Sequence, residues 1–186
     1  MAIFSDVQIA SNALILLGDE PISSFNDTGA GAKAAANLYE SSYLSILKSH
    51  RWNFATKKAT LARLTETPTN EFAYQFQLPT DLVLLITTYP VSTYRILEDK
   101  LYSDSLTIEV DYIYRVEEAK LPGYFIKAFE YYLATQLSIP VTEDLNKHDL
   151  IRQMFERESR SARYADAQSQ PSVGIIDTPY IVERNY

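Results

Sequence analysis

The stretch from Ala30 to Ala55 constrains the fold most, because its hydrophobic period changes partway along it. Its first part has apolar residues at the spacing of one helix face: Ala32, Ala35, Ala36, Tyr39, Tyr43, Ile46 and Leu47. The helical period stops at Arg51-Trp52-Asn53-Phe54-Ala55. Trp52 is the only tryptophan, and a ring of this size usually packs where elements meet. We therefore expect a core helix that leads into a strand region.

The N-terminal segment predicts a shorter helix. Ser5 and Gln8 have the spacing of a capping box, with Ser5 as the N-cap. Val7, Ala10, Leu14 and Leu17 then form a helical stripe. Gly18 can end the helix because glycine adopts the left-handed conformation easily.

Beyond Trp52 the hydrophobic pattern has a period of two, which is typical of strands with one buried face. The expected strands cover residues 72–78, 82–88, 94–97 and 106–114. Polar turns separate them, so residues 61–116 predict an antiparallel β meander inserted between helices.

The helical pattern returns after Pro122. A stripe that includes Phe125, Phe129 and Leu133 predicts a helix that ends at Ile139-Pro140. Thr142 is the expected N-cap of a last helix, which runs to about residue 167. The fold class is thus α+β, with a helical bundle from residues 1–60 and 117–167, the β-rich insertion 61–116, and an extended arm 168–186.

The C-terminal arm contains two prolines and a glycine and has no regular period, which predicts an extended segment. An extended segment rich in apolar residues is typical of one that becomes ordered on a partner. The candidate partner-binding residues are Ile175, Ile176, Tyr180, Ile181, Val182 and Tyr186.

Composition narrows the functional classes. The 186 residues carry a net charge of −7, which argues against a protein that grips nucleic acid by neutralising phosphates. A protein that surrounds DNA without holding it stays compatible with this charge. No apolar run reaches the roughly 18 residues that a membrane helix needs, and the N-terminus does not resemble a secretory signal. The absence of cysteine excludes disulfides and thiolate chemistry.

No motif predicts catalysis, a cofactor or a metal site. Gly29-Ala30-Gly31-Ala32-Lys33 precedes a helix, but its spacing does not match a phosphate-binding loop. His50 and His148 have no partner at metal-ligand spacing, although residue counts alone leave a Ser-His-Asp triad open. A glycosidase pair could in principle use Glu20, Asp27 or Asp81, yet all three read as loop or turn residues.

The motifs taken in order resemble the tail tubular protein A family, the head-to-tail connector or adaptor proteins of tailed bacteriophages. The resemblance covers roughly residues 7–167 and leaves residues 90–111 and the arm unmatched. Its motifs are Leu16-Leu17-Gly18-Asp19-Glu20-Pro21-Ile22, the alanine-rich helix with Tyr39, Arg51-Trp52-Asn53-Phe54-Ala55, Phe72-Ala73-Tyr74-Gln75-Phe76-Gln77-Leu78-Pro79-Thr80-Asp81, Phe125-Ile126-Lys127-Ala128, Leu137-Ser138-Ile139-Pro140-Val141-Thr142 and Ala162-Arg163-Tyr164-Ala165-Asp166-Ala167.

This resemblance implies a structural virion protein of the neck or tail, assembled in the host cytoplasm, without catalysis or cofactors. Copies would form a ring, typically a dodecamer, between the portal protein and the tail tube or nozzle. Double-stranded DNA would pass through the ring without sequence-specific binding during genome ejection, and no membrane would be involved.

Two other classes stay open. A tail-associated peptidoglycan hydrolase would need an acid/base carboxylate pair in a cleft. A small bacterial domain, encoded by a prophage, is the third interpretation. Ring formation would separate the connector from both, and activity on purified cell walls would favour the hydrolase.

Overall fold

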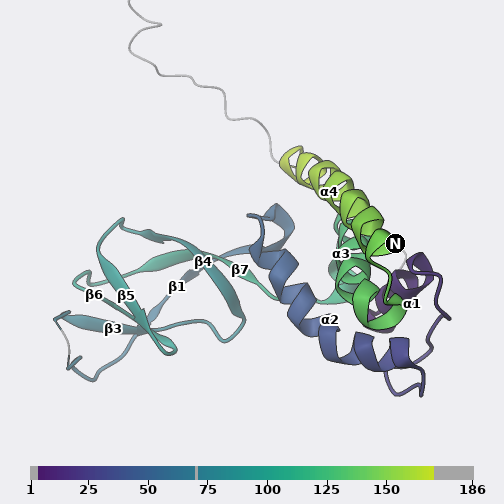
Figure 1. The fold of residues 1–186 in the computed structure, drawn as a ribbon. Helices are drawn as coiled ribbons and strands as arrows, with labels where there is room; N and C mark the ends of the chain where they lie inside the picture. Colours follow the sequence, from purple (N-terminus) through teal and green to yellow (C-terminus); the bar gives the residue numbers. More distant parts are fainter. Residues whose placement is uncertain (1–3, 70, 170–186) are drawn as a thin grey trace, which may run out of the picture.

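Helices occupy one end of an elongated molecule and two β-sheets occupy the other (Figure 1). The computed structural model describes residues 4–69 and 71–169. The helices are α1 (Asp6–Leu16), α2 (Ala30–Lys48), α3 (Gly123–Thr142) and α4 (Leu145–Ala167). The strands are β1 (Thr56–Thr60), β2 (Ala62–Arg63), β3 (Tyr74–Gln77), β4 (Leu82–Tyr89), β5 (Tyr94–Leu97), β6 (Lys100–Ser103) and β7 (Glu109–Tyr114). This arrangement confirms the α+β class.

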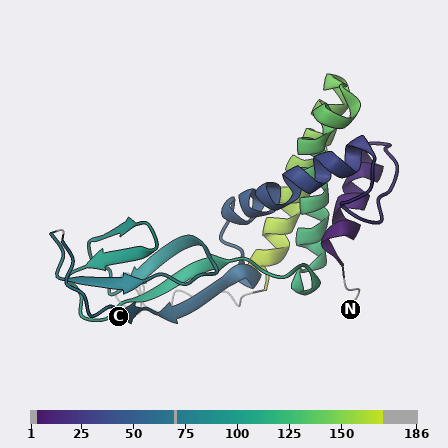
Figure 2. The ribbon, with the colours of Figure 1, turned by 90° about the horizontal axis from the view of Figure 1, so that it is seen from below.

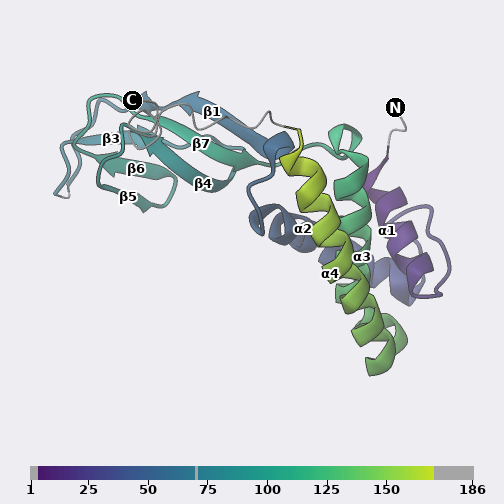
Figure 3. The same cartoon turned by 90° about the horizontal axis from the view of Figure 1, so that it is seen from above.

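Helix α3 is the centre of the helical end, because it packs against α1, α2 and α4. Figures 2 and 3 show α3 and α4 running side by side, with α1 and α2 on other sides of α3. The fully buried residues of α3 include Phe125, Phe129 and Leu133, as its stripe predicts. They meet the buried face of α2, where the Tyr43 and Phe129 ring centroids are 5.2 Å apart.

The helix ends follow from local sequence. The Gln8 amide donates to the Ser5 hydroxyl at 3.1 Å, so Ser5 caps α1 as expected. Gly18 has a φ of 74° and so adopts the left-handed conformation that ends the turn after α1.

The C-terminal helices differ from the prediction at one point, the break between them. Helix α3 continues through Pro140 to Thr142, and Asp144 rather than Thr142 caps α4. Proline removes one backbone donor, but the last turn is held by two other bonds. Thr142 Oγ1 donates to Ser138 O at 2.7 Å, and Glu143 N donates to Ile139 O at 3.1 Å.

The strands form two antiparallel sheets instead of the single meander that the sequence predicts. Their orders are β1-β7-β4 and β2-β3-β6-β5. Strand β7 pairs with β1 on one edge and with β4 on the other, although β1 lies far from it in the sequence. A meander would leave β7 at an edge, whereas its buried residues Val110, Tyr112 and Ile113 favour a central position.

The first strand begins at Thr56, within the segment that the sequence assigns to the helical bundle. Its sequence, TKKAT, is polar and almost wholly exposed, so it resembles a loop. It becomes a strand because the whole of it pairs with β7. The two sheets share a core of their own, which includes Phe76, Leu101 and Ile108.

Candidate functional site

The predicted partner-binding residues of the arm, 175, 176, 180, 181, 182 and 186, lie outside the described residues. The site that can be built from contacts is therefore the base of the arm, where α4 ends at Ala167 and the described chain ends at Ser169. Figure 3 shows that this end of α4 lies beside the entry to β1.

Asp166 organises the arm base. The residue is only 1% exposed, and its carboxylate accepts one hydrogen bond from Asn53 N at 2.8 Å and one from the Tyr124 hydroxyl at 2.8 Å. A buried carboxylate is stable only when hydrogen bonds replace its lost water. These bonds join the last turn of α4 to the turn before β1 and to the start of α3.

The Asp166 carboxylate affects the pKa of two neighbouring side chains. Burial, and then the hydrogen bond to Asp166, raise the pKa of the Tyr124 hydroxyl. Burial and the nearby Arg163 lower the pKa of His50, while Asp166 opposes that shift. Asn53 adds a second tie, because its Nδ2 donates to Asp166 O at 2.8 Å and to Ser169 Oγ at 3.3 Å.

Trp52 fixes the turn that carries Asn53. Its ring is fully buried, and Nε1 donates to Ile46 O at 3.1 Å. The ring lies edge-on to Phe125, with centroids 5.1 Å apart. The tryptophan thus anchors the junction between α2, α3 and β1, as its position in the sequence indicates.

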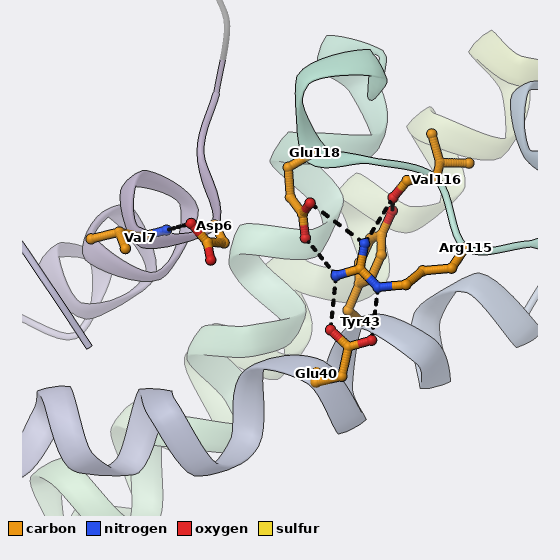
Figure 4. A network of polar contacts seen from close by, with 7 residues as sticks. All are labelled: Asp6, Val7, Glu40, Tyr43, Arg115, Val116 and Glu118. Atoms are coloured by element: carbon orange, nitrogen blue, oxygen red, sulfur yellow. Dashed lines mark hydrogen bonds and ion pairs between the residues drawn. The ribbon is translucent and has the colours of Figure 1, made fainter. Parts of the chain in front are cut away.

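Arg115 makes a second connection between the sheets and the helices (Figure 4). Its Nε and Nη2 donate to the two carboxylate oxygens of Glu40, both at 2.8 Å, and Nη2 also donates to Glu118 Oε1 at 2.8 Å. Its guanidinium lies 4.8 Å from the centroid of the Tyr43 ring, whose hydroxyl donates to Val116 O at 2.7 Å. The hydrogen bonds to Glu40 raise the pKa of Arg115, and the same contact lowers the pKa of Glu40.

The His148 side chain contacts a serine, but the pair has the geometry of a packing contact. Ser138 Oγ lies 2.7 Å from His148 Nδ1 and donates to Thr135 O at 2.7 Å. The direction of the bond to Nδ1 follows the histidine tautomer, and both side chains lie where α3 packs against α4. Ser138 is also fully buried between α3 and α4.

Two of the three candidate glycosidase carboxylates line one cavity. Glu20 and Asp27 lie with Asp19 around an open cavity of about 280 Å³ beside the start of α2. Asp27 accepts bonds from Ser23 N at 2.9 Å and Ser24 N at 3.2 Å, and these lower its pKa. A general acid needs a raised pKa, so Asp27 is unsuited to that role.

The third candidate, Asp81, lies in the sheet region. It forms an ion pair with Lys57 at 2.7 Å and accepts a bond from the Tyr112 hydroxyl at 3.0 Å. The Lys57 contact lowers the pKa of Asp81, while burial and the bond to Asp81 raise the pKa of Tyr112 to about 12. This carboxylate holds β1 against β7 and its neighbours.

The glycine segment before α2 already has an anionic neighbour. Gly29 is the N-cap of α2 and makes no side-chain cap bond. The Asp19 carboxylate lies so close to Gly31 that any side chain there would collide with it. The negative charge of this carboxylate next to the first turn of α2 disfavours a ligand phosphate there.

The sequence did not identify Asp166, Arg115 or Glu40 as important residues. Asp166 belongs to the motif 162–167, but its partner Asn53 is far away in the sequence and no local pattern pairs them. Arg115 follows the predicted strand 106–114. This neighbouring strand was the only sequence feature that indicated where Arg115 lies.

Searches for relatives give no family assignment, because no protein-family model and no curated protein sequence matches this chain. Within residues 4–69 and 71–169, no helix is long and apolar enough to span a lipid bilayer. The same residues contain no group of three or more histidine or carboxylate side chains placed to hold a metal ion.

Proposed function

We propose that this protein is a structural virion component, a head-to-tail adaptor of a tailed bacteriophage. Copies form a ring between the portal and the tail tube or nozzle, with dodecameric stoichiometry, and the ring prolongs the DNA channel. The observation that best supports the proposal is the contact between Asn53 and Asp166. It brings together two of the motif segments on which the resemblance rests, and it does so at the base of the arm.

The shape of the molecule also suits an adaptor. The helices and the sheets lie at opposite ends, so the helical ends can pack around a ring while the sheets project from it (Figure 1). Large apolar side chains are exposed on both parts, including Ile15 and Leu150 on the helices and Val91 near β5. Apolar surface of this kind is typical of proteins that assemble.

The charge of the chain suits a channel wall. A net charge of −7 repels phosphate, so DNA can slide without being held. This part of the proposal requires that acidic side chains face the lumen. A map of the ring that placed mainly basic side chains there would contradict it.

The arm is the proposed connection to the portal or to a neighbouring subunit. Its apolar residues would become buried on assembly.

The first experiment measures the mass of the purified protein alone and after mixing with its proposed portal protein. We expect a multi-copy ring on the portal. A protein that stays monomeric and does not bind the portal would contradict the adaptor, and activity on purified cell walls would then favour the hydrolase.

Arm variants test the connection itself. A chain that ends at Ser169 should fold but fail to join the portal. A full-length variant with Ile175, Ile176 and Ile181 changed to serine keeps the arm length and should fail in the same way. Normal assembly of both variants would remove the arm from the proposal.

A further inference from the structure

Strand β5 is an edge strand whose side chains are exposed to solvent. It lies at the end of the order β2-β3-β6-β5, so β6 is its only neighbour among the described strands. All four of its residues are exposed, and Tyr94, Ile96 and Leu97 are each at least 40% exposed. The strand therefore presents apolar side chains on both faces and covers neither core.

The hairpin geometry also leaves backbone groups free on the outer edge of β5. Leu97 pairs with Lys100 across a two-residue turn, and Ile96 pairs with Leu101. Residues that flank such a turn exchange both hydrogen bonds, and bonded and non-bonded pairs then alternate. The amides of Arg95 and Leu97 consequently point to β6, and those of Tyr94 and Ile96 point outward.

The edge at β5 lacks the lysine residues that protect the edge at β1 from pairing with another strand. The edge strand β1 carries Lys57 and Lys58, and lysine is the residue that most often guards an edge. On β5 the one charged residue is Arg95, which is paired with Glu71 at 3.2 Å. Val91, which is 87% exposed, and Leu106 extend the apolar surface near the strand.

We infer that β5 is a strand-addition site, and that its occupant is the apolar segment 175–182 of the C-terminal arm of a neighbouring copy. The segment contains Ile175, Ile176, Tyr180, Ile181 and Val182, and β-branched and aromatic residues of this kind favour strands. It also contains Pro179, which has no amide hydrogen, so the contact requires the register in which residue 179 faces away from β5 on the new outer edge. Strand addition gives affinity through the backbone and lets alternate side chains cover exposed apolar ones.

The length of chain before this segment sets how close the neighbouring copy must be. Residues 170–174 follow Ser169, which lies at the junction of the helices and the sheets, and they span on the order of 17 Å when extended, so β5 of the neighbouring copy must come within about this distance of Ser169. The choice of a neighbouring copy, instead of the arm's own subunit, rests on the proposed function, because a ring needs connections between subunits.

Cysteine cross-linking tests the contact in the full-length protein, since the natural chain contains no cysteine. One variant carries Arg95→Cys and a second, distinguishable by a mass tag, carries Ile181→Cys. The two are mixed at high concentration and treated with a short bifunctional thiol reagent. We expect a dimer that joins one copy of each variant, and we expect it to be lost when Leu150→Cys, an exposed site on α4, replaces Arg95→Cys.

Edge variants test whether the backbone of β5 makes the contact. Ile96→Pro removes an outward amide without removing a bond to β6, and it should abolish the mixed dimer. Tyr94→Lys with Ile96→Lys keeps the backbone and should also abolish it, while circular dichroism reports folding of both variants.

Three results would overturn the inference. They are the absence of a mixed dimer, a dimer that joins two copies through Arg95→Cys, and a cross-link within one chain when both cysteines are in the same molecule. The mass measurement on the portal is independent of this test. A mixed dimer without a ring keeps the strand contact and contradicts the adaptor, whereas a ring without a mixed dimer does the reverse.

Discussion

Asn53 donates two hydrogen bonds to Asp166, from its backbone nitrogen to Oδ2 and from Nδ2 to the carbonyl oxygen, both at 2.8 Å. These residues belong to the turn before β1 and to the last turn of α4. The contact therefore ties the entry to the sheets to the end of α4, at the junction of the two parts of the molecule.

We expect Asp166→Ala to lower the free energy of unfolding by about 2–4 kcal/mol, because it leaves the Asn53 amide and the Tyr124 hydroxyl without their partner. Urea unfolding followed by Trp52 fluorescence measures the change, since this only tryptophan is buried at the same junction. Asp149→Ala, in an exposed pair with Arg152, is the control and should cost less than about 0.5 kcal/mol. Equal effects of the two substitutions would show that the hydrogen bonds of Asp166 do not stabilise the junction between α4 and the turn before β1.

Arg115→Lys should lower the free energy of unfolding by about 1–2 kcal/mol, although it keeps the charge. Lysine cannot form the two-pronged contact with Glu40 while also reaching Glu118. Chemical unfolding at neutral pH measures the loss. Lys120→Ala breaks an exposed pair with Glu117 and should change stability by less than about 0.5 kcal/mol. An Arg115→Lys variant of unchanged stability would mean that the contacts of Arg115 with Glu40 and Glu118 do not stabilise the connection between the sheets and the helices.

The periodic parts of the fold could be predicted because they follow from local sequence. The predicted stripe of α2 is buried except for Ala36, which is exposed. The strand 94–97 has the expected residues, and Ser5 caps α1. Strands β1 and β6 were missed. The polar strand β1 becomes a strand through its pairing with the distant β7, whereas β6 pairs both with the adjacent β5 and with the distant β3. The order of the first sheet depends on the long-range pairing of β1 with β7, and that of the second on the pairing of β3 with β6.

The arm base could be predicted only in part. Trp52 marked the junction, since a single buried indole is visible in the sequence. Asp166 did not stand out, because an aspartate on a charged helix usually faces solvent and only the fold brings it beside Asn53. The predicted position of the break between α3 and α4 was wrong for a related reason. The bond from Thr142 to Ser138 O that holds the turn after Pro140 can form only when these residues are already helical.

Glu143→Gly should raise the free energy of unfolding by about 0.5–1 kcal/mol. Glu143 ends α3 in the left-handed region, with a φ of 52°, and glycine adopts this conformation without the strain of a Cβ. Thermal and urea unfolding measure the gain. Glu156→Gly, inside α4, is the matched control and should destabilise by about 1 kcal/mol. A loss of stability in both variants would show that the Glu143 side chain contributes more than its backbone strain costs.

Glu130 should make stability depend on pH in the acidic range. Burial raises its pKa above the ordinary value of 4.5, against the opposing effects of the Asn12 hydrogen bond at 2.6 Å and of Lys127. The native state therefore holds this proton more tightly than the unfolded state, so the associated stability is present below pH 4.5 and is lost as pH rises through the native pKa. Glu130→Gln keeps an oxygen for Asn12 and removes the buried charge. We expect the variant to be more stable than the natural protein at neutral pH, and the difference in the free energy of unfolding should shrink as pH falls to about 4.

Urea unfolding at several pH values measures this difference, with Glu156→Gln on the surface of α4 as the control. A gain that is constant with pH would mean that packing around residue 130, and not its ionisation, sets the effect.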